Sequence, residues 1–185
     1  MTLRQIAVTG TRRIVVSRHA GALFFALAIG LGASLRVYLP FTPVPITCQS
    51  LFILFGASLL KRYYSLEMIG LYLLFGGLGL PFFAAGIGGW SYLLGPTGGY
   101  LVGFVLMTAV LGFGLDHCPK RWQQLLLFVV AAKIVFIPGL LWLKLFLHAD
   151  WSKTLALGFY PFILGDFLKI ALAFSAYTVV SRKKN

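Results

Sequence analysis

The chain is 185 residues long, 59% of them hydrophobic, and its mean hydropathy is +0.91. This composition excludes an ordinary soluble protein and predicts a single integral membrane domain over residues 1–185. The formal net charge is +12 with only four acidic residues. Because the basic residues lie beside apolar segments rather than on one soluble face, nucleic acid is not expected as a partner.

Residues 1–19 form a basic N-terminal segment ahead of the first apolar run. That run resembles the hydrophobic part of a signal peptide, and Ala26-Leu27-Ala28 fits the small-residue pattern of a cleavage site. The site lies in the middle of the apolar run, with no polar stretch before it. We therefore interpret the run as a retained membrane helix.

Six segments reach or approach the roughly 20 apolar residues that a membrane-spanning helix requires. They are residues 20–39, 47–60, 66–84, 92–115, 123–147 and 161–181. Together they predict an all-α fold, a compact bundle of six transmembrane helices over residues 20–181, followed by a basic tail at 182–185. If the six helices cross the membrane one after another, most basic residues lie on one side of the membrane. By the positive-inside rule both termini are then cytoplasmic, in a multi-pass protein of the cytoplasmic (inner) membrane.

The segment 20–39 carries small residues at a spacing of four, beginning with Ala22 and Ala26 and continuing through Gly30 and Ser34. Such a stripe lets two membrane helices approach closely. It is consistent either with packing inside the bundle or with docking of a partner helix. The breadth of the stripe slightly favours a partner, with Ala22 and Ala26 as the docking residues.

Two of the connections on the side opposite the termini are rich in polar groups or glycine. Residues 39–50 contain three prolines, which impose extended backbone, together with Thr47 and Gln49. Residues 81–97 contain several glycines, some of which could let backbone amides approach a ligand. The candidates in this second connection are Gly88, Gly89, Trp90 and Tyr92. Gly95, Gly99 and Gly103 instead predict close packing of the following helix.

The last apolar segment contains an acid and a base, Asp166 and Lys169, three residues apart. A charge inside a membrane helix costs about 2.5–3.5 kcal/mol on insertion scales. Counted from Pro161, Asp166 lies about 7–9 Å inside the helix, and Lys169 is one turn deeper on the same face. We expect both to face a polar cavity together with the two connections, although a self-satisfied ion pair that only stiffens the bundle is the alternative. Lys133, another deep charge, either snorkels to the cytoplasmic face or reaches the same cavity.

Signals of catalysis are weak. The segment around Ser91 is no nucleophile elbow, the histidines lack metal-ligand spacing, and no glycine-rich run is followed by Lys-Ser or Lys-Thr. We therefore expect no enzymatic activity, no metal site and no cofactor.

Three motifs stand out along the chain. The first is Phe41-Thr42-Pro43-Val44-Pro45-Ile46-Thr47-Cys48-Gln49, the second runs from Gly79 to Tyr100, and the third runs from Pro161 through Gly165-Asp166-Phe167-Leu168-Lys169. Together they resemble the BioY family, the biotin-specific S components of energy-coupling factor (ECF) transporters. The resemblance extends over residues 20–180. Cys48, Arg36 and Lys133 depart from the family pattern.

The resemblance implies an S component of the ECF type that binds biotin with high affinity in the lipid bilayer. Its partners would be a transmembrane coupling protein (T component), which docks at Ala22 and Ala26, and two ATPases that supply energy for biotin uptake. Biotin offers ureido N–H groups and a carbonyl, a carboxylate and an apolar body, and these match the candidate site: Asp166, Lys169, Thr47, Gln49, Gly88, Gly89, Trp90, Tyr92 and Tyr100. The alternatives are an S component for another vitamin, a biotin carrier that works alone as a homo-oligomer, and an intramembrane enzyme that uses Asp166.

Overall fold

The computed structural model of the chain describes residues 3–60, 62–84 and 86–182, and most of them are helical. The longer helices are α1 (Leu3–Ser34), α2 (Gln49–Leu60), α3 (Arg62–Gly77), α5 (Gly98–Gly114), α6 (Arg121–Ile134), α7 (Phe136–Leu147) and α9 (Ile163–Arg182). The shorter elements are α4 (Trp90–Leu93), η1 (Leu115–His117), α8 (Trp151–Gly158) and η2 (Tyr160–Phe162), with strands β1 (Arg36–Val37) and β2 (Ile46–Thr47).

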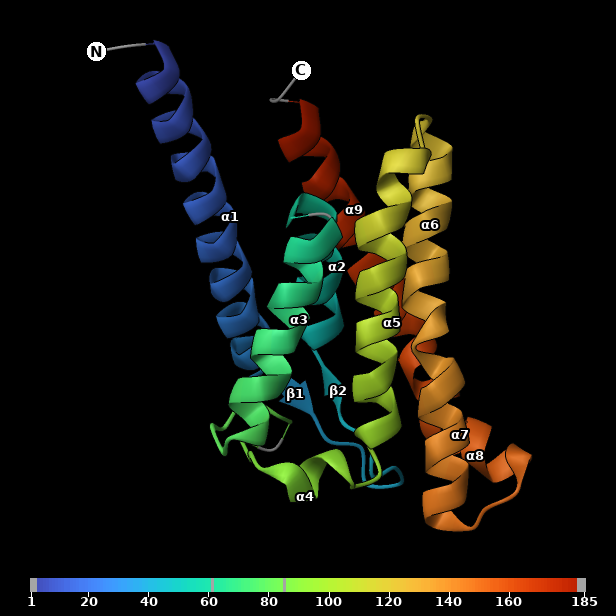
Figure 1. Cartoon of the computed structure of the whole chain (residues 1–185). Helices are drawn as coiled ribbons and strands as arrows, with labels where there is room; N and C mark the ends of the chain where they lie inside the picture. The colour runs from blue at the N-terminus through green and yellow to red at the C-terminus, as the bar shows by residue number, and fades with distance from the viewer. Residues whose placement is uncertain (1–2, 61, 85, 183–185) are drawn as a thin grey trace.

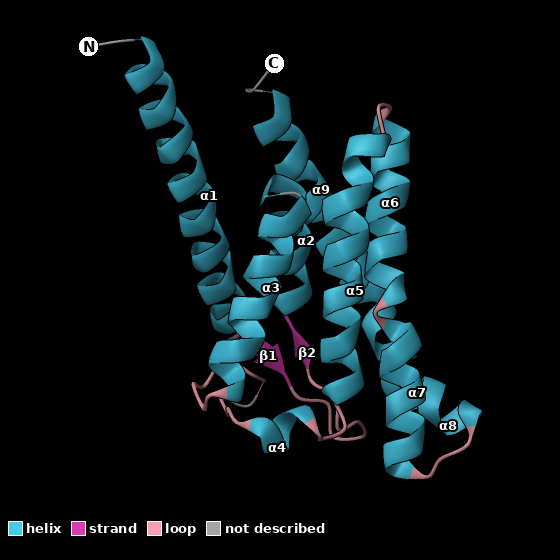
Figure 2. Ribbon diagram, viewed as in Figure 1, coloured by secondary structure: helices cyan, strands magenta, loops and turns pink. Residues whose placement is uncertain are grey.

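The longer helices lie side by side as an up-and-down bundle, in which α6 and α7 together form one rod (Figure 1). Short connections force consecutive helices to run antiparallel. Both ends of the chain consequently lie at one end of the bundle, and the β1–β2 hairpin, α4 and α8 lie at the other (Figure 2). The order of these rods matches the order of the six apolar segments predicted from the sequence.

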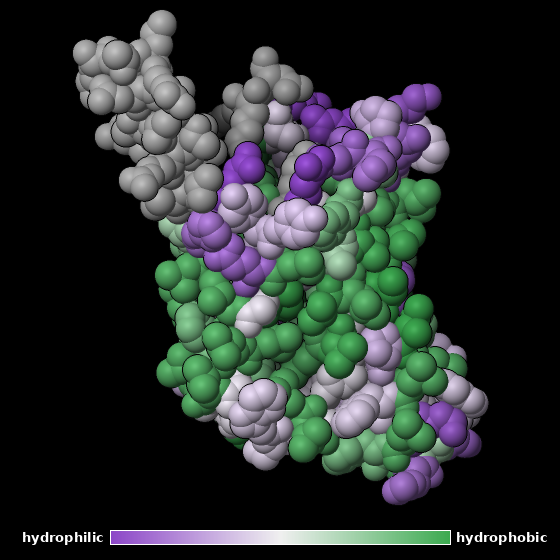
Figure 3. Space-filling model, viewed as in Figure 1, coloured by the Kyte–Doolittle hydropathy of each residue, from purple (hydrophilic) through white to green (hydrophobic). Residues whose placement is uncertain are grey.

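Apolar side chains cover the flank of the molecule in a broad band, with polar side chains collected mainly at the end where α5 turns into α6 (Figure 3). Within the described residues, three helical stretches are long and apolar enough to cross a membrane, namely Gly98–His117, Arg121–Leu147 and Trp151–Arg182. Arg18–Ser34 and Gln49–Leu60 are shorter apolar helices. The chain is therefore a multi-pass membrane protein.

The structure corrects the predicted helix ends at the hairpin end of the bundle. The first helix stops at Ser34 rather than at residue 39, because the chain then pairs Arg36 with Thr47 in an antiparallel ladder. The backbone N–H of Cys48 donates to the carbonyl oxygens of Gly32 and Leu35, both at 3.1 Å. These bonds fix the start of α2 against the end of α1.

The fourth and fifth predicted helices are also interrupted. Residues 90–97 form α4 and a turn, so α5 begins at Gly98 and not at residue 92. The rod of α6 and α7 is broken at Val135. Pro138 explains that break, since it has no N–H to donate to the carbonyl of Ile134 and its ring crowds the preceding turn.

Glycine allows α5 to pack at the centre of the bundle against α6 and α7. A Cβ added at Gly103 would lie 2.6 Å from the carbonyl oxygen of Val135, closer than real Cβ atoms come. Gly99 similarly faces the backbone of Pro138. Gly95 lies outside α5, so only the last two members of the predicted glycine ladder serve helix packing.

An ion pair and a hydrogen bond between side chains join the elements at the polar end. Arg62 Nε lies 2.9 Å from Asp116 Oδ2, which connects the start of α3 to η1. Glu67 forms a hydrogen bond with His19 of α1 at 2.8 Å. Because α3 begins at Arg62, Glu67 lies in the second turn of the helix rather than at its start. Its carboxylate therefore holds α3 to α1 instead.

Candidate ligand-binding site

A cavity of about 730 Å³, counting its open mouth, lies inside the bundle towards the hairpin end. The hairpin, α2, α5, the α6–α7 rod and α9 contribute its wall. Six of the predicted site residues line it: Thr47, Gln49, Tyr92, Tyr100, Asp166 and Lys169.

Asp166 is the buried acid of the cavity, with 8% of its surface exposed. Its ion pair is with Lys133 of α6, whose Nζ lies 3.2 Å from Asp166 Oδ2. Lys133 thus reaches the acid that lines the cavity, which decides between the two orientations left open by the sequence. Lys169 also lines the cavity, but it forms no hydrogen bond or ion pair with any residue in the described ranges. The cavity therefore contains one carboxylate, which is paired with Lys133, and one lysine ammonium group that forms no ion pair with the described residues.

Thr47 and Gln49 form a hydrogen-bonded network at the start of α2. The Thr47 hydroxyl donates to Gln49 Oε1 at 3.0 Å and accepts from the Gln49 backbone N–H at 3.4 Å. Gln49 Nε2 donates to the hydroxyl of Tyr72, which is completely buried in α3. Most of the hydrogen-bonding groups of Thr47 and Gln49 are thus already bonded within the protein. Tyr72 was missed in the sequence, although a tyrosine inside an apolar helix generally requires such a partner.

Aromatic rings form much of the apolar wall. Tyr92 stacks on Phe83 with ring centroids 5.1 Å apart. Tyr100 packs edge-to-face on Phe136, and its hydroxyl donates to the carbonyl of Gly158 at 2.8 Å. Burial raises the pKa of Tyr92, so its hydroxyl keeps its proton. The sequence did not single out the other wall residues of this kind, among them Phe104, Phe136 and Phe162, because a buried aromatic ring in a membrane helix carries no signal of its neighbours.

Gly88, Gly89 and Trp90 do not line the cavity. A Cβ at Gly88 would collide with the backbone of residues 79 and 80, and the Gly89 N–H donates to the Gly76 carbonyl at 2.7 Å. Gly89 also has a φ of +103°, which favours glycine. Trp90 is 71% exposed. Gly88 and Gly89 thus shape the loop before α4, Trp90 begins that helix, and none of the three belongs to the cavity wall.

Of the two roles that the sequence left open for Ala22 and Ala26, the structure shows packing inside the bundle rather than an exposed surface for a partner helix. Both alanines are completely buried, where α1 packs on α2 and α3. The exposed face of α1 carries large side chains such as Phe24 and Leu31, which are 64% and 70% exposed. The small residues therefore let the helices of the bundle approach one another.

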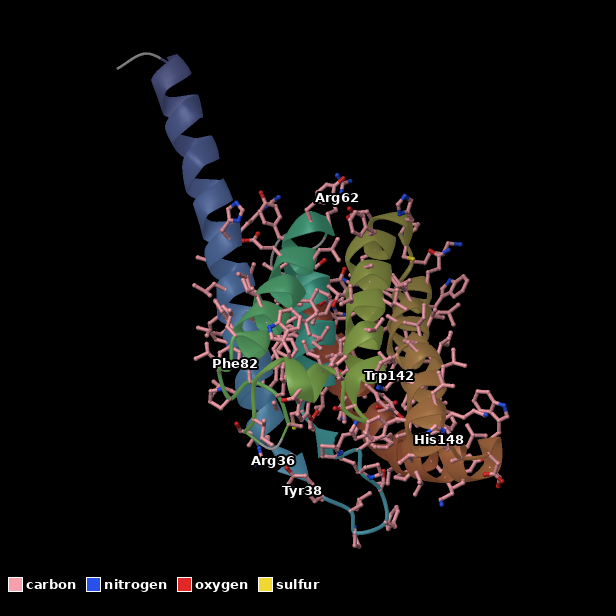
Figure 4. The ribbon with its side chains drawn as sticks, turned by 60° about the horizontal axis from the view of Figure 1, so that its bottom comes forward. Arg36, Tyr38, Arg62, Phe82, Trp142 and His148 are labelled. Carbon is pink, nitrogen blue, oxygen red and sulfur yellow. The ribbon has the colours of Figure 1, made fainter. Side chains whose placement is uncertain are left out.

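The hairpin end provides the approach to the cavity. A second hollow of about 340 Å³ shares Pro45, Tyr92 and other wall residues with the cavity and extends to Tyr38. Arg36 and Tyr38 lie together at this end, far from Arg62 at the opposite end (Figure 4). The Arg36 guanidinium lies 5.5 Å from the centroid of the Tyr38 ring. A cation and an aromatic ring thus border the approach.

The family model that matches this sequence is that of the BioY family, over residues 5–185. The chain belongs to the BioY family. The BioY2 biotin transporter of Lactococcus lactis subsp. cremoris (strain MG1363) is 36% identical over 156 residues, which are 81% of this chain and 86% of the relative. The BioY biotin transporter of Thermotoga maritima is 35% identical over 149 residues, 80% of this chain and 86% of the relative.

One solved structure shares the fold across almost the whole chain. It is the S component for biotin from an ECF-type ABC transporter, with a TM-score of 0.79 and 24% sequence identity. The alignment covers 98% of this chain and 95% of the other. The predicted membership of the BioY family is confirmed, and so is the S-component type of fold. Of the three BioY motifs, the first forms β2 and the start of α2, and the third lies in α9, so both border the cavity.

Proposed function

We propose that this protein is the biotin-binding S component of an ECF transporter and mediates biotin uptake. The observation that carries the proposal is that Asp166 and Lys169 lie on one face of α9 and both line a mostly apolar cavity. Asp166 is paired with Lys133, whereas Lys169 has no ion-pair partner among the described residues. The N–H groups of the biotin ureido ring can donate hydrogen bonds to the Asp166 carboxylate. The ureido carbonyl can accept a hydrogen bond from Lys169. The apolar body of biotin suits the wall formed by Tyr92, Tyr100 and Phe136. BioY relatives named as biotin transporters support the same ligand.

Transport energy comes, in this proposal, from a T component and two ATPases, and this chain catalyses no reaction. The chain has no glycine-rich phosphate loop of its own. The proposal places six membrane crossings in the cytoplasmic membrane, with both termini on the cytoplasmic side. The common end of the two termini and the basic residues of that end, Arg62 and Arg121 among them, support this orientation.

Equilibrium binding to the purified protein tests the ligand. Biotin should bind tightly, whereas thiamine, riboflavin and pantothenate should not compete with it. Asp166→Asn should weaken biotin binding about ten- to hundredfold, as expected for a lost hydrogen bond to a charged group. The control is Asp150→Asn, since Asp150 caps α8 outside the cavity and asparagine caps equally well. Tight binding of another vitamin without biotin binding would overturn the proposal.

Uptake measurements test the partners. Cells that produce this chain with the T component and the ATPases should accumulate labelled biotin, and an ATPase variant that cannot hydrolyse ATP should abolish accumulation. Equal uptake by the chain alone would instead indicate a carrier that works without them.

A further inference from the structure

Lys133 occupies a polar and aromatic niche that lies beside the cavity but outside its wall. Its Nζ donates to Asp166 Oδ2 at 3.2 Å. The same atom lies 5.3 Å, 5.8 Å and 5.5 Å from the ring centroids of Phe136, Phe159 and Phe167. All three distances fall within the range of about 6 Å over which an aromatic face attracts a cation. Three rings and one carboxylate thus surround a single ammonium group.

This niche compensates a charge that would otherwise be unfavourable. A lysine at this depth of a membrane helix generally extends its ammonium group towards the polar interface. Lys133 instead turns to Asp166 on α9, and 31% of its side chain remains exposed. The cost of leaving water is offset by the ion pair and by the aromatic faces. Lys133 is therefore held in place by contacts that involve Asp166 and none of the other polar groups of the cavity.

The position of Lys133 determines which lysine pairs with Asp166. Lys169 follows Asp166 by three residues on the same helix face, a spacing at which an acid and a base can pair. In the structure the ion pair of Asp166 is with Lys133, and Lys169 has no ion-pair partner among the described residues. Without Lys133, the carboxylate would turn to Lys169 and the two cavity groups would satisfy each other.

We propose that Lys133 is a positioning residue for ligand binding. It holds Asp166 by one carboxylate oxygen, so that the second oxygen and the Lys169 ammonium group are both available to a ligand with a donor and an acceptor side by side. This role rests on the proposed function, because the ligand that it serves is biotin. Lys133 itself does not contact the ligand, since it does not line the cavity.

A double-mutant cycle on the purified full chain separates this role from a purely structural one. Biotin affinity is measured for the wild type, Lys133→Met, Asp166→Asn and the double variant. Lys133→Met should weaken binding about ten- to hundredfold. In the Asp166→Asn background the same change should have no further effect, because no carboxylate remains to be positioned. Lys133→Arg keeps the charge and should restore most of the affinity.

The matched control is Lys144→Met. Lys144 also lies near an aromatic ring, 5.5 Å from the centroid of Trp151, but it does not contact Asp166. This variant should bind biotin like the wild type. If Lys133→Met does not accumulate in the membrane, Lys133→Gln takes its place in the cycle.

The outcomes distinguish the two proposals. Wild-type protein that does not bind biotin contradicts the proposed function. Wild-type binding with an unchanged affinity of Lys133→Met overturns the positioning role alone. Equal losses in the wild-type and Asp166→Asn backgrounds also overturn it, since Lys133 would then act through packing.

Discussion

At the scale of single residues, the proposed site depends on which lysine pairs with the Asp166 carboxylate. Asp166 is paired with Lys133, and Lys169 contributes an additional positive charge to the cavity. The sequence identified Asp166 and Lys169 because charges are rare and costly in apolar helices. It could not decide where Lys133 points, since hydropathy along α6 contains no information on which helix lies next to it. The partner of Asp166 is a tertiary property.

Lys169→Met should weaken biotin binding about ten- to hundredfold, because a buried hydrogen bond from a charged group is lost. Asp166 and Lys169 are neighbours on one helix face, so they can reach adjacent atoms of a single ureido group. We therefore expect the loss to be equal for biotin and for biotinamide, which lacks the carboxylate. Calorimetry with both ligands measures this. A loss confined to biotin would mean that Lys169 binds the carboxylate instead.

At the scale of elements, the sequence predicted the apolar helices well and their ends less well. Pro96 and Pro138 lie where the structure interrupts two predicted helices, but a proline inside an apolar run does not reveal whether the helix kinks or stops. The β1–β2 ladder was missed because each strand has only two residues. The sequence also left open whether the small-residue stripe at Ala22 and Ala26 packs inside the bundle or docks a partner, and slightly favoured the partner. In a membrane protein the lipid-facing and core-facing sides of a helix are both apolar, so periodicity alone does not separate them.

Glycine substitutions test the close packing of α5. Gly103→Ala places a Cβ 2.6 Å from the Val135 carbonyl oxygen and 2.8 Å from Val135 Cα. Because backbone atoms cannot move aside easily, we expect destabilisation of about 1–3 kcal/mol. The control is Gly70→Ala in α3, where an added Cβ meets nothing within 4 Å. Alanine is the better helix former by up to about 1 kcal/mol, so this variant should be at least as stable as the wild type.

Thermal unfolding in detergent measures the stability of both glycine variants. The readout is the fraction of protein that remains soluble and monodisperse at each temperature. A Gly103→Ala protein as stable as Gly70→Ala would mean that α5 and the α6–α7 rod lie further apart than in the structure.

At the scale of the whole molecule, the two ends of the bundle differ in chemistry and in role. The end with both termini carries the Arg62–Asp116 ion pair and the hydrogen bond between His19 and Glu67, which connect helices to one another. The other end carries the hairpin and α8, which the Thr42 hydroxyl connects by donating to the Leu157 carbonyl at 2.7 Å. The cavity lies towards this second end. We therefore expect a ligand to enter the bundle opposite the termini.

Labelling of single cysteines tests which side of the membrane each end faces. In a background with Cys48→Ser and Cys118→Ser, one cysteine is introduced at Lys153 in α8 or at Lys120, which directly precedes α6. Both positions are exposed and lie at opposite ends of the bundle. In right-side-out vesicles a membrane-impermeant maleimide should label Lys153→Cys at once. It should label Lys120→Cys only after permeabilisation, because basic residues near helix ends remain on the cytoplasmic side. Biotin binding by the cysteine-free background confirms that the fold is intact, and the reverse labelling pattern would show that the cavity opens to the cytoplasm.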